Sequence, residues 1–118
     1  MLEVRFISCE DDGIDQIVSF AIEDDAVGIR SLILLRTPKH EAILDQDERG
    51  VSVSLEYEDD DEVDLLKVVR IEAQCIAIET QASKYELDTS RVESAEISEM
   101  KALLGRMNFD KKFRIEGA

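Results

Sequence analysis

The sequence predicts an α+β protein, in which a mainly antiparallel sheet carries one C-terminal amphipathic helix packed on one face. Short runs of β-branched and other apolar residues recur through the first ninety residues, as expected for strands. One segment, residues 92–107, instead repeats its apolar residues at intervals of three and four, as an amphipathic helix does. A length of 118 residues is typical of a single domain, 1–118, with one core.

The first half of the chain predicts three strands and a short helical turn. "VRFIS" and "DQIVSFAIE" are separated by turn residues around Gly13, so they should form a hairpin. "RSLILLRT" is a continuous apolar run, typical of a central strand covered on both faces, and Thr37-Pro38 should end it. One helical turn is expected at residues 41–44.

"VSVSLEY", residues 51–57, has the clearest alternation of the chain. It places Val51, Val53, Leu55 and Tyr57 on one face, so it predicts that Tyr57 is buried. The acidic run that follows should be a loop, because adjacent like charges repel one another. The length of residues 65–80 allows one long strand but favours a hairpin with a turn near Ala73-Gln74, and "YELDTS" should form a short strand.

The helix should begin after the polar residues near position 90. The apolar stripe consists of Val92, Ala95, Met100, Leu103, Leu104 and Met107. Thr89, Ser90 or Ser94 is expected to cap it, and "SRVE" matches a capping box. The helix should end between Gly105 and Asn108, and the tail should add an edge strand through Phe113 and Ile115.

The charge is strongly negative and unevenly distributed. Asp and Glu number 28 against 14 Lys and Arg, which gives a net charge of −14. Residues 1–66 hold nineteen acids and five bases, while residues 67–118 hold nine of each, so the whole excess lies in the first part. Such a charge repels nucleic acid and anionic membranes and attracts basic proteins. We therefore predict a basic protein partner, and neither nucleic acid nor membrane.

The start of the chain lacks the cationic region and apolar run of a signal peptide. No apolar stretch approaches the roughly eighteen residues of a membrane span. These features predict a cytoplasmic protein, in which Cys9 and Cys75 should be reduced core residues rather than a disulfide. The sequence does not determine the oligomeric state.

The densest charge lies at Glu56 to Asp64, where seven of nine residues are acidic. Three interpretations are open: a solvated loop, a loose site for a divalent cation, or a docking surface for a basic partner. On the third interpretation, the predicted partner-binding residues are Asp59, Asp60, Asp61, Glu62 and Asp64. Tyr57 would serve as an aromatic anchor there only if its ring were exposed.

No catalytic motif is present. Asp45, Asp47, Gly50 and Glu56 fall at positions 1, 3, 6 and 12 of a calcium-binding EF-hand loop. Arg49 occupies position 5, however, and a strand follows where a helix should begin, which favours a polar turn. His40 has no predicted catalytic partner and is expected to be an ordinary surface residue. We predict no enzyme activity, no catalytic residues, no metal ligands and no cofactor.

The order of several segments resembles a known family. "SLILLR", then "LDQDERGVSVSLE", then paired β-rich stretches and a closing "SAEISEMKALLGRM" helix resemble a small α+β immunity-protein family of bacterial polymorphic toxin systems. The resemblance covers about residues 30 to 108. It implies a protein that neutralises one cognate toxin by tight, stoichiometric binding.

Two alternatives come from other classes of protein. An acidic secretion chaperone or adaptor would also be small, but it would usually be a dimer, so the mass in solution separates the two. A calcium-binding module predicts a large stabilisation by calcium, about 2.7 kcal/mol at a hundred times the dissociation constant.

Overall fold

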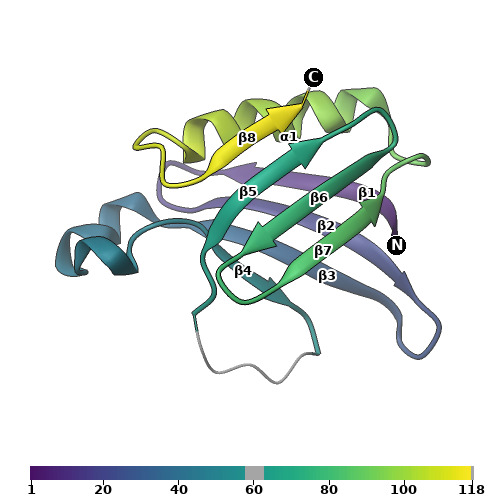
Figure 1. Cartoon of the computed structure of the whole chain (residues 1–118), viewed down its shortest axis with the longest axis horizontal. Helices are drawn as coiled ribbons and strands as arrows, with labels where there is room; N and C mark the ends of the chain where they lie inside the picture. The colour runs from purple at the N-terminus through teal and green to yellow at the C-terminus, as the bar shows by residue number, and fades with distance from the viewer. Residues whose placement is uncertain (58–62, 118) are drawn as a thin grey trace.

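The computed structural model describes residues 1–57 and 63–117, which form one eight-stranded mixed sheet and one α-helix (Figure 1). The strands are β1 (Leu2–Asp11), β2 (Gln16–Asp24), β3 (Gly28–Arg36), β4 (Ser52–Leu55), β5 (Leu66–Ile71), β6 (Cys75–Thr80), β7 (Lys84–Asp88) and β8 (Arg114–Gly117). The helix is α1 (Ser94–Met107), and two short 3-10 helices, η1 (Pro38–Ile43) and η2 (Gln46–Glu48), follow β3. The expected α+β class is confirmed. The sheet is mixed because the β1–β7 and β5–β8 pairs are parallel.

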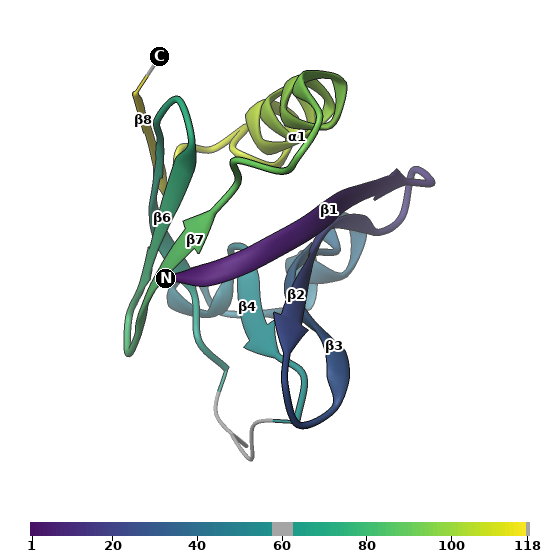
Figure 2. The ribbon, with the colours of Figure 1, turned by 90° about the vertical axis from the view of Figure 1, so that its right-hand side faces the viewer.

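The sheet folds back on itself as two arms. The order β4-β3-β2-β1-β7-β6-β5-β8 divides into a β1–β4 arm and a β5–β8 arm, joined through β1 and β7. Among the described residues, two pairs make that joint, Leu2↔Leu87 and Glu3↔Asp88. Beyond them the arms diverge, and α1 lies in the opening (Figure 2). On the other side, a bridge between Ser52 and Leu65 connects β4 to the start of β5. The core therefore lies between two layers of one curved sheet.

The β1–β4 arm follows the predicted hairpins. β1 pairs with β2 across the turn at Gly13, and β2 pairs with β3, both antiparallel. Leu32, Leu34 and Arg36 alternate along β3 and are fully buried, whereas the residues between them are only half-buried. The expectation that β3 is covered on both faces is wrong, because β3 is next to the edge strand β4 and, within residues 1–57 and 63–117, no helix packs on its outer face.

The β5–β8 arm also matches its local signals. β5 and β6 form the predicted hairpin around Ala73-Gln74, and β7 pairs with β6. β8 lies at the sheet edge, as expected of the tail, with buried Phe113 just before it. Gly117 has a φ of +98°, and a Cβ there would lie 1.9 Å from the carbonyl oxygen of Ile71.

Helix α1 places its apolar face on β1 and β2. Met100, Leu103, Leu104 and Met107 are buried, and the helix ends at Met107, within the predicted range. Ala95, by contrast, is exposed.

The predicted caps of α1 are wrong. Glu93 occupies the N-cap position without a side-chain hydrogen bond, so neither Thr89, Ser90 nor Ser94 caps the helix. The first turn is instead tied to the sheet, because the backbone N–H of Ile7 donates to Glu96 Oε1 at 2.7 Å.

Cys9 and Cys75 are free thiols, as expected, and both are half-buried; Cys9 packs against the edge of the core, whereas Cys75 does not belong to it. Within the described ranges, no helix is long and apolar enough to cross a membrane.

Candidate binding groove

The predicted partner-binding residues divide into two groups. Asp59, Asp60, Asp61 and Glu62 lie outside the described residues. Asp64 is described and is 7% exposed. Its carboxylate accepts hydrogen bonds from the Thr80 hydroxyl at 2.6 Å and from the Ala82 backbone N–H at 3.1 Å. The expectation that Asp64 stands exposed in water is therefore wrong, and its carboxylate holds the entry to β5 against the β6–β7 turn.

Tyr57 lies outside β4, in contrast to its predicted burial. The strand ends at Leu55, and Tyr57 follows in a turn with a φ of 69°, which reverses the alternation of the preceding residues. Its side chain is 70% exposed. Val63, on the other side of residues 58–62, is 71% exposed. In the sequence, an exposed apolar side chain thus stands on each side of residues 58–62.

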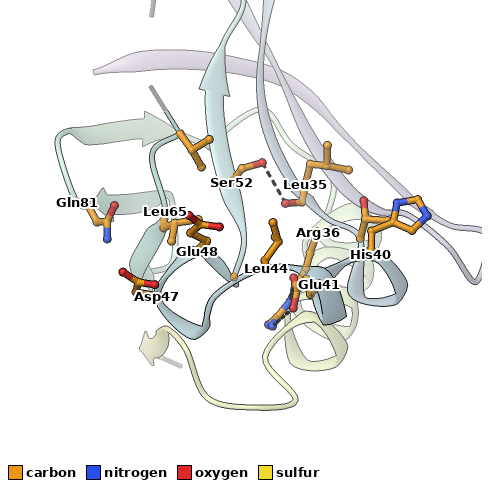
Figure 3. A pocket seen from close by; sticks show the side chains of 13 residues that line it. Leu35, Arg36, His40, Glu41, Leu44, Asp47, Glu48, Ser52, Leu65 and Gln81 are labelled. Carbon is orange, nitrogen blue, oxygen red and sulfur yellow. Dashed lines mark hydrogen bonds and ion pairs between the residues drawn. The ribbon is translucent and has the colours of Figure 1, made fainter. Parts of the chain in front are cut away.

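A groove of about 660 Å³ opens between the end of β3, the two 3-10 helices and the starts of β4 and β5, with Val63 in its lining (Figure 3). Its lining includes Leu35, Thr37, His40, Leu44, Asp47, Glu48, Gly50, Ser52, Val63, Leu65 and Gln81. Arg36 and Glu41, which pair with each other, also line it, so aliphatic side chains from three separate segments share one concave surface with this ion pair and with the carboxylates of Asp47 and Glu48. The Ser52 hydroxyl donates to the carbonyl oxygen of Leu35 at 3.2 Å, joining two of the walls.

Arg36 holds the η1 wall of the groove in place. Its guanidinium is fully buried, and all five of its N–H donors are used. Two donate to the Glu41 carboxylate, both at 2.8 Å, and two to the Asp110 carboxylate at 2.9 and 2.8 Å. The fifth donates to the carbonyl oxygen of Met107 at 2.8 Å, and the Phe109 ring lies 4.3 Å from the guanidinium carbon. One side chain thus ties β3, η1 and the end of α1 together.

The charges around Arg36 stabilise each other. Burial disfavours the guanidinium cation, but the hydrogen bonds to Asp110 and Glu41 outweigh this effect and raise the pKa of Arg36. Hydrogen bonding from Arg36 likewise lowers the pKa of Asp110 below its ordinary value of 3.8. Sequence reasoning missed this cluster because arginine is usually a surface residue. The sequence does contain a pattern that indicates the cluster: Arg36 continues the alternation of Leu32 and Leu34, and Glu41 follows it by five residues.

Two further cations hold the η1–η2 segment. Arg49 donates from Nε and Nη2 to the carbonyl oxygen of Leu44, at 3.2 and 3.0 Å. Lys112 donates from Nζ to the carbonyl oxygen of Gln46 at 3.0 Å. These bonds go to backbone oxygens, so they fix the segment without neutralising its carboxylates. Among the described residues, neither Asp47 nor Glu48 has an ion-pair partner.

The EF-hand spacing does not form an EF-hand. Asp47 lies within η2, and the segment Ser52–Leu55 is strand β4, as the alternation predicted. The Glu56 carboxylate accepts a hydrogen bond from the backbone N–H of Ser31 at 3.2 Å. In the described part of the chain, no group of three or more His, Cys, Asp or Glu side chains is placed to hold a metal ion. His40 is exposed and lines the groove through η1.

Comparison with known proteins adds no relationship: no family model, curated protein or solved structure matches this chain.

Proposed function

We propose that this chain is a non-enzymatic protein-binding domain whose negative surface binds a basic protein, as an immunity protein binds the toxin that it neutralises. The resemblance in segment order supports the second half of this proposal, and a cytoplasmic location fits it. The first half depends on charge.

The observation that carries the proposal is that four of the five bases of residues 1–66 are engaged within the chain, Lys39 being the exposed exception. Arg5 pairs with Glu23, Arg30 pairs with Asp24, and Arg36 lies buried between two carboxylates. Arg49 bonds a backbone carbonyl, as described above. These contacts leave Asp47 and Glu48 unpaired among the described residues, close to Val63 at the end of the acidic run.

A surface of this kind favours association with cationic proteins in two ways. Long-range attraction raises the rate of encounter, and this effect decreases steeply as ionic strength rises. Carboxylates also match the phosphate-binding cationic clefts of nucleases in geometry and opposite charge, so a toxin with such a cleft is a suitable partner. Asp59, Asp60, Asp61 and Glu62 extend this surface in our proposal, with exposed Tyr57 as an aromatic anchor. Asp64 is left out because its carboxylate is bonded internally.

The test uses a partner identified by co-purification at low ionic strength and then purified. Association is measured by stopped flow for the native chain and for the variant Asp59→Asn, Asp60→Asn, Asp61→Asn, Glu62→Gln. We expect the variant to associate about tenfold more slowly at low salt, with a weaker dependence on salt.

A matched control separates the local surface from the total charge. The variant Glu10→Gln, Asp25→Asn, Glu86→Gln, Glu99→Gln removes four exposed carboxylates elsewhere and has the same net charge. It should associate nearly as fast as the native chain. Equal slowing of both variants, or of neither, would contradict the proposed surface. If the chain is an immunity protein, expression of the partner alone should stop bacterial growth, and co-expression of this chain should restore it.

A further inference from the structure

The groove beside η1 and η2 combines an apolar floor with an acidic rim, and neither feature is explained by the packing of the chain itself. Leu44 is 37% exposed and Val63 is 71% exposed, although both are aliphatic and line the same concavity. Ile43, next to Leu44, is 89% exposed. Exposed apolar residues that gather at a concave surface are typical of a binding site.

The rim determines which occupant fits. Asp47 and Glu48 line the groove without ion-pair partners in the described part of the chain. A second copy of this chain would bring a net charge of −14 against them, so self-association through the groove is disfavoured. A partner segment with an aliphatic or aromatic side chain flanked by Lys or Arg would contact the apolar floor and pair with the acidic rim.

The groove is also held in shape before any partner arrives. Arg36 fixes η1 through Glu41, Arg49 fixes the carbonyl of Leu44, and Lys112 fixes the carbonyl of Gln46. A wall that is already ordered loses little conformational entropy on binding, so more of the contact energy appears as affinity.

We infer that this groove is the anchor site of the basic partner: it takes one apolar side chain of the partner on Leu35, Leu44 and Val63, while a flanking Lys or Arg pairs with Asp47 and Glu48. The inference deepens the proposed function and rests on it, because it names the chemistry of the partner segment. The two proposals predict different kinetic effects. Loss of apolar contacts in the groove should raise the dissociation rate, whereas loss of surface charge should lower the association rate.

The first experiment selects peptides from a random 12-residue display library against the immobilised native chain. The recovered peptides should carry Leu, Ile, Phe or Met with Lys or Arg within two residues on either side. Titration of a recovered synthetic peptide into the ¹⁵N-labelled chain should shift the amide signals of Leu44, Gly50 and Ser52. A selection that recovers no peptide, or peptides that shift other regions instead, overturns the inference.

The second experiment measures the affinity of that peptide for groove variants by calorimetry. Val63→Asp and Leu44→Asp should each weaken binding by about tenfold or more, because they place a charge where the apolar side chain sits. The control Val27→Asp changes a half-exposed residue in the β2–β3 turn, at the opposite end of β3, and should leave affinity unchanged. Val63 is the more exposed of the two groove residues, so its variant keeps the test valid if Leu44→Asp lowers stability.

Kinetic measurements with the purified partner distinguish an error in the groove inference from an error in the proposed function. If neutralising residues 59–62 slows association while Val63→Asp leaves dissociation unchanged, the groove is not the anchor and the charged surface stands. If neither set of variants changes the kinetics, both are wrong.

Discussion

Arg36 shows how much of the groove depends on a single residue. Replacing it with Met leaves Glu41 and Asp110 facing each other without the cation that lies between them. Removing one partner of a buried ion pair typically costs about 3–5 kcal/mol. We expect Arg36→Met to lower the free energy of unfolding by that amount in urea titrations. The triple variant Arg36→Met, Glu41→Gln, Asp110→Asn should regain most of the loss, and equal instability of both variants would contradict this explanation.

The same cluster predicts a response to acid. Hydrogen bonding from Arg36 lowers the folded-state pKa of Asp110 below 3.8, so the carboxylate stabilises the fold fully only above that ordinary value. Its contribution is lost as the pH falls below 3.8 and through the lower folded-state pKa. Stability should therefore decrease in this window, and Asp110→Asn should make the decrease shallower in urea titrations between pH 5 and about 2.5. Asp25→Asn, in the exposed β2–β3 turn, is the control. An unchanged profile in Asp110→Asn would exclude this role.

At the scale of elements, α1 protects the edge of β1 beyond its joint with β7. The Ile7 N–H, which no longer faces β7, donates to Glu96. Glu96→Ala should lower stability by about 1–3 kcal/mol because it leaves a part-buried donor without an acceptor. Hydrogen exchange at Ile7 should accelerate. Glu96→Gln keeps a carbonyl acceptor and should lose much less, so similar effects of both changes would argue against the bond.

Gly117 allows β8 to lie against β5. A methyl group there would meet the carbonyl oxygen of Ile71, and the φ of +98° is unfavourable for any other residue. Gly117→Ala should detach the end of β8 and raise hydrogen exchange along β5, at a cost of about 1–3 kcal/mol. Gly105→Ala, in the exposed part of α1 with open space around it, should instead be neutral or stabilising. A β8 that keeps its protection in Gly117→Ala would contradict this role.

Elements with local signals were predicted from the sequence, while features set by distant contacts were not. The β5–β6 hairpin and the end of α1 follow from turn residues and apolar period, which neighbouring residues determine. The parallel β1–β7 joint pairs residues 85 positions apart (87 minus 2), and no local pattern encodes it. The groove escaped prediction for the same reason, since Leu35, Leu44 and Leu65 come from three separate segments. Tyr57 was misplaced because alternation does not show where a strand ends.

For the whole molecule, the net charge of −14 predicts a general response to salt. Self-repulsion destabilises the compact state, so raising NaCl from 10 to about 300 mM should raise the melting temperature. CaCl₂ at equal ionic strength should have a similar effect. A calcium-specific gain of about 2.7 kcal/mol would instead indicate a built calcium site and favour the calcium-binding module.

The two residue pairs that join β1 to β7 also set the order in which the fold can assemble. The hairpins β1–β2–β3 and β5–β6–β7 close through short turns, whereas the joint must bring together residues 85 positions apart in the sequence. Closing so long a loop is slow compared with forming hairpins. We therefore expect two preformed halves to meet late in refolding, and pulse-labelling should show the amides of β2 and β6 protected before those at the joint.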